Sequence, residues 1–238
     1  MTRHDAKRFL FGAHAIALSG LITSPAPRIL SPSPVVALPV TGGHQQQRIE
    51  HIRIDGMVSA DAASVQVAGV AHDDRHATLA TATIEKLNIL DVVTADRIVA
   101  RLASDYPAQA GEASAFLVGS HFENLRIAGS YVRFRMNDGL VSGTEWYEPR
   151  RRSNGIVYTS LVRDIDNVPG RVEGCRIDIP EFGSIYLGEV FAGRDTRRLI
   201  MLRIELGCAI EGRLIAGELD AHWALLSLAG DDPTRPKG

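Results

Sequence analysis

The densest group of reactive side chains in the sequence is the run His72-Asp73-Asp74-Arg75-His76. Alternate residues of an extended chain share one face, so His72, Asp74 and His76 would be able to bind a divalent cation together. Aspartate and histidine are equally typical of turns, and this run lies between two β-like apolar segments. We therefore expect a turn here, and we predict that the protein uses neither a metal nor another cofactor.

Nucleophilic catalysis needs a hydroxyl or thiol beside a base, and Ser120 with His121 is the most obvious such pair. Adjacent residues of a strand point to opposite faces, so these two side chains would not readily hydrogen-bond. The sequence contains no Gly-x-Ser-x-Gly elbow and no His-Glu-x-x-His motif. Carboxylate pairs such as Glu145 with Glu148 would suit glycoside hydrolysis, but nothing selects one pair over another. The sequence therefore predicts a protein that is not an enzyme.

Two short stretches are better suited to binding a ligand than to catalysis. Trp146 and Tyr147 are adjacent in a polar segment, and an aromatic face offers apolar area on which a sugar ring can stack. Arg133 and Arg135 alternate with apolar residues, so both fall on one strand face and would be able to bind an anion or a partner. The alternatives are that the aromatic rings pack onto a sheet and that the arginines are solvated. These four residues are the candidate ligand-binding residues.

The composition is that of an ordinary globular protein: 238 residues, 45% hydrophobic and 23% charged. A chain of this length buries enough surface to fold without a metal or a disulfide. The 26 basic and 28 acidic residues give a formal charge of −2, which provides no overall attraction to nucleic acid or acidic membranes. We therefore predict no nucleic-acid partner.

The two cysteines, Cys175 and Cys208, belong to no Cys-x-x-Cys motif or Cys/His cluster, which argues against a zinc site. They allow a single intramolecular disulfide. That disulfide is expected if the chain is exported, because oxidising compartments preserve disulfides. Two free, partly buried thiols are the alternative, and both remain open at this point.

The N-terminal residues 1–22 have two interpretations. Basic residues precede an apolar run at 9–22, which is the order found in a signal peptide, but no clear Ala-x-Ala cleavage site follows. The same run alternates like a first strand, so we predict a first strand or a signal segment of unusual form. The run is too short for a membrane-spanning helix, which needs roughly 20 apolar residues. We therefore predict no transmembrane segment.

Three further regions follow along the chain. Residues 23–47 contain five prolines, a density that excludes a helix or a central strand, and we predict an extended surface connector. Residues 48–230 are predicted to form the β-rich domain, and residues 231–238 a polar tail.

Most of the β-rich region is punctuated like a series of antiparallel strands. Residues 94–104 have helical spacing as well as β-like neighbours, and we predict a strand there. Asn137-Asp138-Gly139 is a hairpin-turn signal. Residues 183–191 and 199–206 are predicted to form an antiparallel hairpin. The expected fold is all-β, with long, mostly antiparallel strands in a sandwich or curled meander; a β-solenoid is the alternative.

Four phrases along the chain resemble one another: residues 14–22 (HAIALSGLI), 82–90 (ATIEKLNIL), 120–129 (SHFENLRIAG) and 208–217 (CAIEGRLIAG). Each has an apolar strand, a small polar break and then a Leu-x-Ile or Leu-Ile pair. Their irregular spacing weakens a strict solenoid, since similar strands of one sheet would look the same.

Residues 80–100 (ATATIEKLNILDVVTADRIVA) resemble the choice-of-anchor P family of bacterial surface-associated proteins, with Thr94-Ala95-Asp96 and Val99-Ala100 at matching places. Residues 121–129 (HFENLRIAG) and 179–187 (IPEFGSIYL) are similar to two further phrases of that family. The resemblance implies a secreted or envelope-associated β-domain of unassigned activity, and it brings no catalytic residues with it.

The function expected from these observations is that of a non-catalytic structural or interaction protein of the bacterial envelope or exterior. Its partner would be an unknown envelope or extracellular component, such as a glycan. The alternative is a carbohydrate- or small-ligand-binding β module that uses Trp146, Tyr147, Arg133 and Arg135. An enzyme of unknown type is a distant third.

Overall fold

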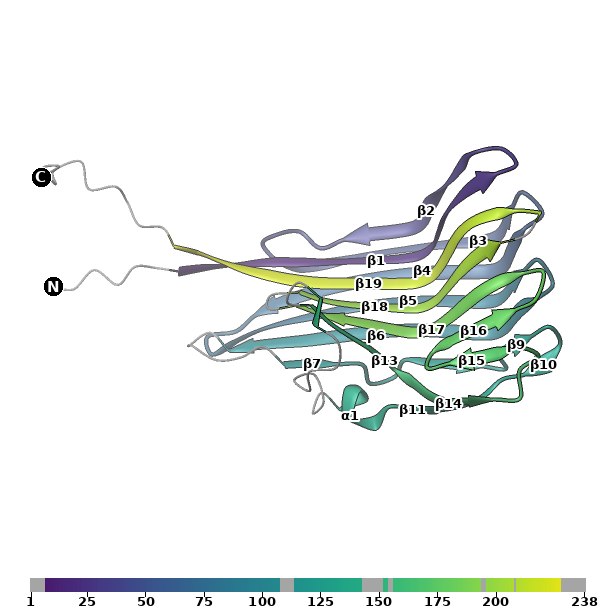
Figure 1. Ribbon diagram of the computed structural model, residues 1–238. Coiled ribbons are helices and arrows are strands. Elements are labelled where there is room, and N and C mark those ends of the chain that lie inside the picture. The colour runs from purple at the N-terminus through teal and green to yellow at the C-terminus, as the bar shows by residue number, and fades with distance from the viewer. Residues whose placement is uncertain are drawn as a thin grey trace, which may run out of the picture.

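The computed structural model describes residues 7–107, 114–142, 152–153, 156–193, 196–207 and 209–227 (Figure 1). Its strands form a nine-stranded sheet, an eight-stranded sheet and a separate two-stranded ribbon, and the strand pairs within the described residues are antiparallel. The two larger sheets lie face to face in Figure 1, with the eight-stranded sheet behind. The prediction of an all-β sandwich with long antiparallel strands is therefore confirmed.

The nine-stranded sheet has the path β12-β13-β17-β18-β19-β1-β2, with β15 and β16 attached beside β17. In that order its strands span Arg152–Ser153, Ile156–Ser160, Gly183–Ala192, Thr196–Gly207, Glu211–Ser227, Lys7–Ser24 and Arg28–Ala37, then Arg171–Glu173 (β15) and Arg176–Ile179 (β16). The predicted hairpin over residues 183–206 is present as β17 and β18.

The eight-stranded sheet has the path β10-β9-β6-β5-β4-β3, with β7 and β8 attached to β6. In that order its strands span Ser130–Tyr131, Arg126–Ile127, Val93–Pro107, Arg75–Ile89, Val58–Ala71 and Gly43–Ile54, then Ser114–Phe116 (β7) and His121–Glu123 (β8). The ribbon pairs β11 (Arg133–Met136) with β14 (Val162–Asp166), and α1 (Asp138–Val141) follows β11.

The core lies between the two large sheets and follows the period-two alternation of their strands. In β5, Ala80, Ala82 and Ile84 are buried while Thr81 and Thr83 between them stay partly exposed. Burying each larger aliphatic side chain contributes about 1.5–3 kcal/mol, so this alternating pattern fixes which face of each strand turns inward.

Both sheets bend sharply along one row of residues that crosses the strands, and β17, β18 and β19 turn upward together in Figure 1. In the nine-stranded sheet, Leu187 pairs with Leu202 and Glu189 with Ile200, which leaves Gly188 opposite Met201. The same counting gives the two bend rows. They are Ala17, Gly217, Met201 and Gly188 in the nine-stranded sheet, and His51, Asp61, Lys86, Asp96 and Asn124 in the eight-stranded sheet.

Every second strand crosses its bend row with a left-handed residue. The φ angles are 62° at Gly188 and 69° at Gly217, and they are 55°, 53° and 51° at His51, Lys86 and Asn124. Because neighbouring strands are antiparallel, the strands of one sheet that carry these residues run in the same direction. Each such residue also resets the in-out alternation of its strand.

The reset explains why similar phrases recur in the sequence. Ile84 and Leu87 are both buried although they are three residues apart, because Lys86 lies at the bend between them. Asn124 occupies the same place before Leu125 and Ile127, which are buried as well. The polar break in these two phrases is therefore the bend residue, and the Leu-x-Ile pair after it returns to the core.

The two bend rows differ in residue type because they face different surroundings. A Cβ at Gly217 would lie 3.2 Å from Met201 Cβ and 3.4 Å from Ala100 Cβ of the opposite sheet, so this row faces the packed interior. His51, Lys86 and Asn124 are exposed and have room for side chains. Glycine is needed only where the left-handed residue faces the interior.

Asp96 joins the exposed bend row into a polar ladder. Its carboxylate accepts hydrogen bonds from Lys86 Nζ at 2.7 Å and from Asn124 Nδ2 at 2.5 Å. The bond from Lys86, followed by that from Asn124, holds the pKa of Asp96 below its ordinary value. A carboxyl group whose pKa is lowered by folding stabilises the fold above its unfolded pKa, and this stabilisation is lost as the pH falls through the folded pKa.

We expect Asp96→Asn to remove this pH-dependent stabilisation. The free energy of unfolding of the variant should then fall less steeply as the pH decreases. The urea midpoint of the wild type should fall more steeply than that of the variant as the pH drops below the ordinary pKa of an aspartate. Urea titrations from pH 6 to pH 3 measure this, with Asp73→Asn in the β4–β5 turn as the control. Parallel pH profiles of wild type and Asp96→Asn would contradict the prediction.

Residues 23–47 do not form the predicted connector. Residues 28–37 form β2, and β3 begins at Gly43. Proline is compatible with β2 because this strand is the edge of its sheet. The Val35 N–H donates instead to Gln47 Oε1 at 3.0 Å, which links the edges of the two sheets.

Two other local predictions have different outcomes. Residues 93–107 form the strand β6, as predicted for residues 94–104. The first strand, β1, covers Lys7–Ser24, so it begins inside the segment 1–22 and ends just after it. The turn predicted at Asn137-Asp138-Gly139 is wrong, because α1 begins at Asp138 and β11 pairs with the distant β14. The chain therefore leaves the sheet at this point and does not double back as a hairpin.

Candidate functional site

On the outer face of the nine-stranded sheet, side chains bury one another at the bend. Ile200 is only 4% exposed and yet does not belong to the core between the sheets. Two carboxylates on the same face, Glu189 and Glu218, are 1% and 6% exposed. Glu189, Ile200 and Glu218 lie in register on adjacent strands, so side chains of this face cover one another there.

Glu189 is held by a two-pronged contact from Arg203, which lies on the neighbouring strand past the bend. Arg203 Nε donates to Glu189 Oε2 at 2.6 Å, and Nη2 donates to Oε1 at 2.6 Å. The guanidinium carbon lies 3.6 Å from the centre of the Tyr186 ring. Burial alone would lower the pKa of Arg203, but the hydrogen bonds and charge of Glu189 outweigh it and raise the pKa.

Glu205 continues this network toward the end of the sheet. One carboxylate oxygen accepts from Arg203 Nη1 and from Arg213 Nη2, the latter at 3.3 Å. The other accepts from the Tyr186 hydroxyl at 3.5 Å. Two carboxylates and two guanidinium groups are thus joined, and their formal charges cancel.

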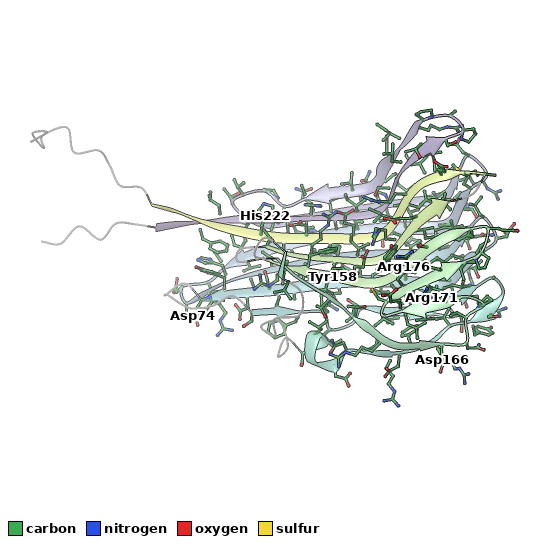
Figure 2. The ribbon with its side chains drawn as sticks, viewed as in Figure 1. Asp74, Tyr158, Asp166, Arg171, Arg176 and His222 are labelled. Carbon is green, nitrogen blue, oxygen red and sulfur yellow. The ribbon has the colours of Figure 1, made fainter. Side chains whose placement is uncertain are left out.

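Tyr158 closes the network on the β13 side, where it is labelled in Figure 2. Its hydroxyl donates to Glu189 Oε1 at 3.0 Å and lies 3.4 Å from Cys175 Sγ, whose thiol is then the donor of that contact. Burial, followed by the bond with Cys175, raises the pKa of Tyr158 above its ordinary value. The phenol therefore keeps its proton and remains a donor to the carboxylate.

The acidic groups of this network are committed to structure. Each oxygen of Glu189 and Glu205 accepts a hydrogen bond from an arginine or a tyrosine. A general base needs a lone pair directed at a substrate, and these lone pairs are directed at fixed donors. The network is suited to holding the bend in shape beside a binding surface.

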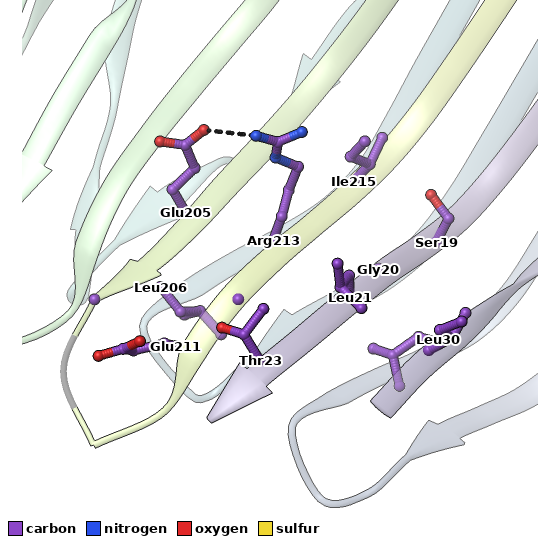
Figure 3. A pocket seen from close by; sticks show the side chains of 13 residues that line it. Ser19, Gly20, Leu21, Thr23, Leu30, Glu205, Leu206, Glu211, Arg213 and Ile215 are labelled. Carbon is purple, nitrogen blue, oxygen red and sulfur yellow. Dashed lines mark hydrogen bonds and ion pairs between the residues drawn. The ribbon is translucent and has the colours of Figure 1, made fainter. Parts of the chain in front are cut away.

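A groove of about 680 Å³ lies on the same face, between the network and the sheet edge (Figure 3). Its walls come from β18, β19 and the β1–β2 hairpin. Its apolar lining consists of Leu21, Ile29, Leu30, Leu206 and Ile215. Leu21 is 47% exposed and Ile29 is 76% exposed, although apolar residues of this size are usually covered.

The charged groups around the groove are unequal in their pairing. Glu205 and Arg213 neutralise each other across adjacent strands, as the dashed line in Figure 3 marks. Glu211 is exposed, and within the described part of the chain it has neither an ion pair nor a side-chain hydrogen bond. The groove therefore combines an apolar floor with one uncompensated negative charge.

Of the four sequence-predicted binding residues, the structure describes Arg133 and Arg135. Arg133 and Arg135 are exposed on one face of β11, but each faces a carboxylate of β14: Asp166 at 2.9 Å and Asp164 at 3.9 Å. Asp166 is labelled on the ribbon in Figure 2. Trp146 and Tyr147 lie outside the described residues.

The cysteine prediction stays open in the same way. Cys175 is buried, with its sulfur 3.4 Å from the Tyr158 hydroxyl, while Cys208 lies outside the described residues. The pairing of Cys175 with Cys208 therefore remains a prediction.

The other reactive residues of the sequence also have structural surroundings. Residues 72–74 form the expected turn between β4 and β5, and His76, in β5, stacks on Phe9 with ring centres 4.1 Å apart. Ser120 Oγ donates to the carbonyl of Arg101, whereas the His121 ring contacts Glu123 at 3.0 Å. Ser120 and His121 thus bind different partners, as strand geometry predicts. No group of three possible metal ligands occurs in the described ranges.

Sequence reasoning missed Glu189 and Arg203. The signal for both was present, since each is a charge in a strongly apolar strand: Glu189 is the only one in GSIYLGEVF, and Arg203 is one of two in LIMLRIEL. A buried charge needs a partner, and the predicted hairpin makes these two strands neighbours. What hid the pair was the bend, because uninterrupted alternation would place Glu189 on the inner face.

Among the described residues, no helix has the length and apolar character to cross a bilayer.

Comparisons with known proteins give a family. No curated protein and no solved structure matches the chain. One family model matches residues 9–151 and 141–192, which together cover more than half of the 238 residues. The chain therefore belongs to the family described as a domain of unknown function, DUF8256.

Proposed function

We propose that this protein is a non-catalytic interaction protein and that the groove on the outer face of the nine-stranded sheet binds a segment of a partner protein. The observation that carries the proposal is the exposure of Leu21 and Ile29 in a groove of about 680 Å³. That volume lies within the range of ligand sites, roughly 300–1,000 Å³. The neighbouring carboxylates serve the fold and not proton transfer, which supports binding over catalysis.

The chemistry of the groove favours a segment that has an apolar side chain next to a lysine or arginine. The apolar side chain would cover Leu21 and Ile215, and the base would neutralise Glu211, the groove residue with an uncompensated charge. Covering apolar surface supplies affinity, and the single charge supplies selectivity.

The partner is expected to dock by its side chains and not by adding a strand at β2. Strand addition would use the Val35 N–H, which points away from β1 and is already bonded to Gln47 Oε1. The open surface near β2 is therefore the sheet face, where the groove lies.

The cell envelope or exterior is the proposed place of action. Support for it comes from the phrases at residues 80–100 and 121–129, which resemble bacterial surface-associated proteins. Fractionation of the native host with an antibody to this protein tests the location, and recovery in the cytoplasmic fraction alone would contradict it.

Selection from a displayed library of random linear peptides tests the groove. We expect enrichment of peptides with an apolar residue beside lysine or arginine. Calorimetry on the selected peptides should show at least about tenfold weaker binding to Leu21→Ser, since burying a leucine contributes about 1.5–3 kcal/mol. Glu211→Gln should remove the preference for the basic residue.

Val70→Ser is the matched control for Leu21→Ser. Val70 is 49% exposed, close to the 47% of Leu21, but it lies on β4 of the other sheet. Its substitution should leave peptide affinity unchanged. The proposal fails if the selected peptides show no apolar-basic preference, or if Val70→Ser weakens them as much as Leu21→Ser does.

A further inference from the structure

The outer face of the eight-stranded sheet has an apolar row that does not belong to the core. The strand register places Leu79, Ala103 and Phe116 side by side on β5, β6 and β7. Leu79 and Phe116 are partly exposed, and neither packs against the core cluster. The ring of Phe116 is the aromatic member of this row, which we call the apolar row.

A row of polar side chains runs alongside the apolar row, two residues away along β5 and β6 and on the same face. The register aligns Gln46, Gln66, Thr81 and Arg101 across β3, β4, β5 and β6. Gln46, Gln66 and Thr81 also line a hollow of about 410 Å³. Across the described ranges, no side chain of these four is hydrogen-bonded or ion-paired to another residue. Their donors and acceptors are therefore free to bind a ligand.

We propose that these two rows bind a glycan chain that lies across β4 to β7, with an acidic sugar next to Arg101. A sugar ring has an apolar C–H face and a rim of hydroxyl groups, which match the apolar row and the polar row respectively. Glutamine and threonine supply both donors and acceptors, as hydroxyl groups require. Strands about 4.8 Å apart repeat these contacts at a spacing close to the size of a sugar ring.

Arg101 determines the charge of the ligand. The arginine that lines the hollow, Arg48, is ion-paired with Glu50 at 3.2 Å and Glu85 at 3.6 Å. Arg101 is exposed and has no ion pair within the part of the chain that the structure describes. A free guanidinium pairs with a carboxylate through two parallel hydrogen bonds, which favours a uronic acid at this end.

This glycan surface is separate from the groove, because the two lie on opposite outer faces of the sandwich. Its success or failure is therefore distinguishable from that of the proposed function. Leu21→Ser alters the groove alone, and Phe116→Ala alters the glycan surface alone.

The test is calorimetry of the full chain with oligogalacturonate, in parallel with a neutral cello-oligosaccharide. We expect oligogalacturonate to bind, and Phe116→Ala to weaken it by up to about tenfold through loss of the stacking face. Arg101→Gln should bring the affinity for oligogalacturonate down to that for the neutral sugar. Arg101 is exposed, so this second variant tests the site without disturbing the fold.

Arg97→Gln is the matched control, because Arg97 is also an exposed arginine of β6, four residues away on the same face. It should leave binding unchanged. Binding that is weakened in both site variants and kept in the control supports the proposal. Absence of binding at millimolar glycan, insensitivity to both site variants, or an equal loss in Arg97→Gln would overturn it.

Discussion

Replacing Arg203 with methionine should lower the free energy of unfolding by about 3–5 kcal/mol, because removal of one partner leaves a buried charge uncompensated. The carboxylate left without its charged partner is Glu189, which is 1% exposed and would keep only the Tyr158 hydrogen bond. Methionine preserves most of the apolar stem that lies on Tyr186, so the loss reports the charge. Urea unfolding at neutral pH measures the effect.

A double-mutant cycle with Glu189→Gln separates the buried charge from loss of packing. The double variant should recover part of the stability lost in Arg203→Met, because no charge is left unpaired. Lower pH should also reduce the loss in Arg203→Met, since the orphaned carboxylate can then be protonated.

Arg213→Met is the control for this cycle, since it breaks a more exposed ion pair with Glu205 and should cost at most about 1 kcal/mol. Equal losses in Arg203→Met and Arg213→Met would show that the Glu189–Arg203 pair has no special weight.

Much of the fold follows from alternation in the sequence, and the exceptions have physical causes. The run LIMLRIEL and its neighbour GSIYLGEVF are predicted correctly as a hairpin because these two apolar, strand-like runs flank a polar segment that contains glycine. The strand β2 was not predicted because prolines argue against a strand unless the segment lies at a sheet edge. An edge position is a property of the whole sheet and cannot be recognised from the local amino-acid sequence.

The bend could not be predicted because its residues differ between the sheets. Lys86 and Asn124 adopt left-handed backbone angles that usually mark glycine, and they do so where an exposed row tolerates a side chain. The recurrence of polar breaks before Leu-x-Ile pairs was the visible trace of it. The candidate site was hidden for the same reason, since the groove and the Glu189–Arg203 pair exist only where the sheet bends.

Gly188→Ala tests the bend directly, and we expect it to lower the free energy of unfolding by about 1–3 kcal/mol. The φ angle of 62° is unfavourable for alanine, and the added Cβ would lie 3.0 Å from Leu161 Cβ and 3.1 Å from Val162 Cγ2. Leu161 and Val162 are both buried and have little room to move. If the backbone left the left-handed region to relieve this, Glu189 would turn toward the core and lose Arg203.

His51→Gly is the opposite change at the other bend row and serves as the control. His51 has a φ of 55° and an exposed side chain, so glycine relieves about 1–2 kcal/mol of left-handed strain. The greater freedom of glycine in the unfolded chain offsets roughly 0.5–1 kcal/mol of that gain. The net change should therefore be small and not destabilising. A loss in His51→Gly as large as that in Gly188→Ala would mean that side chains, and not backbone geometry, determine the bend.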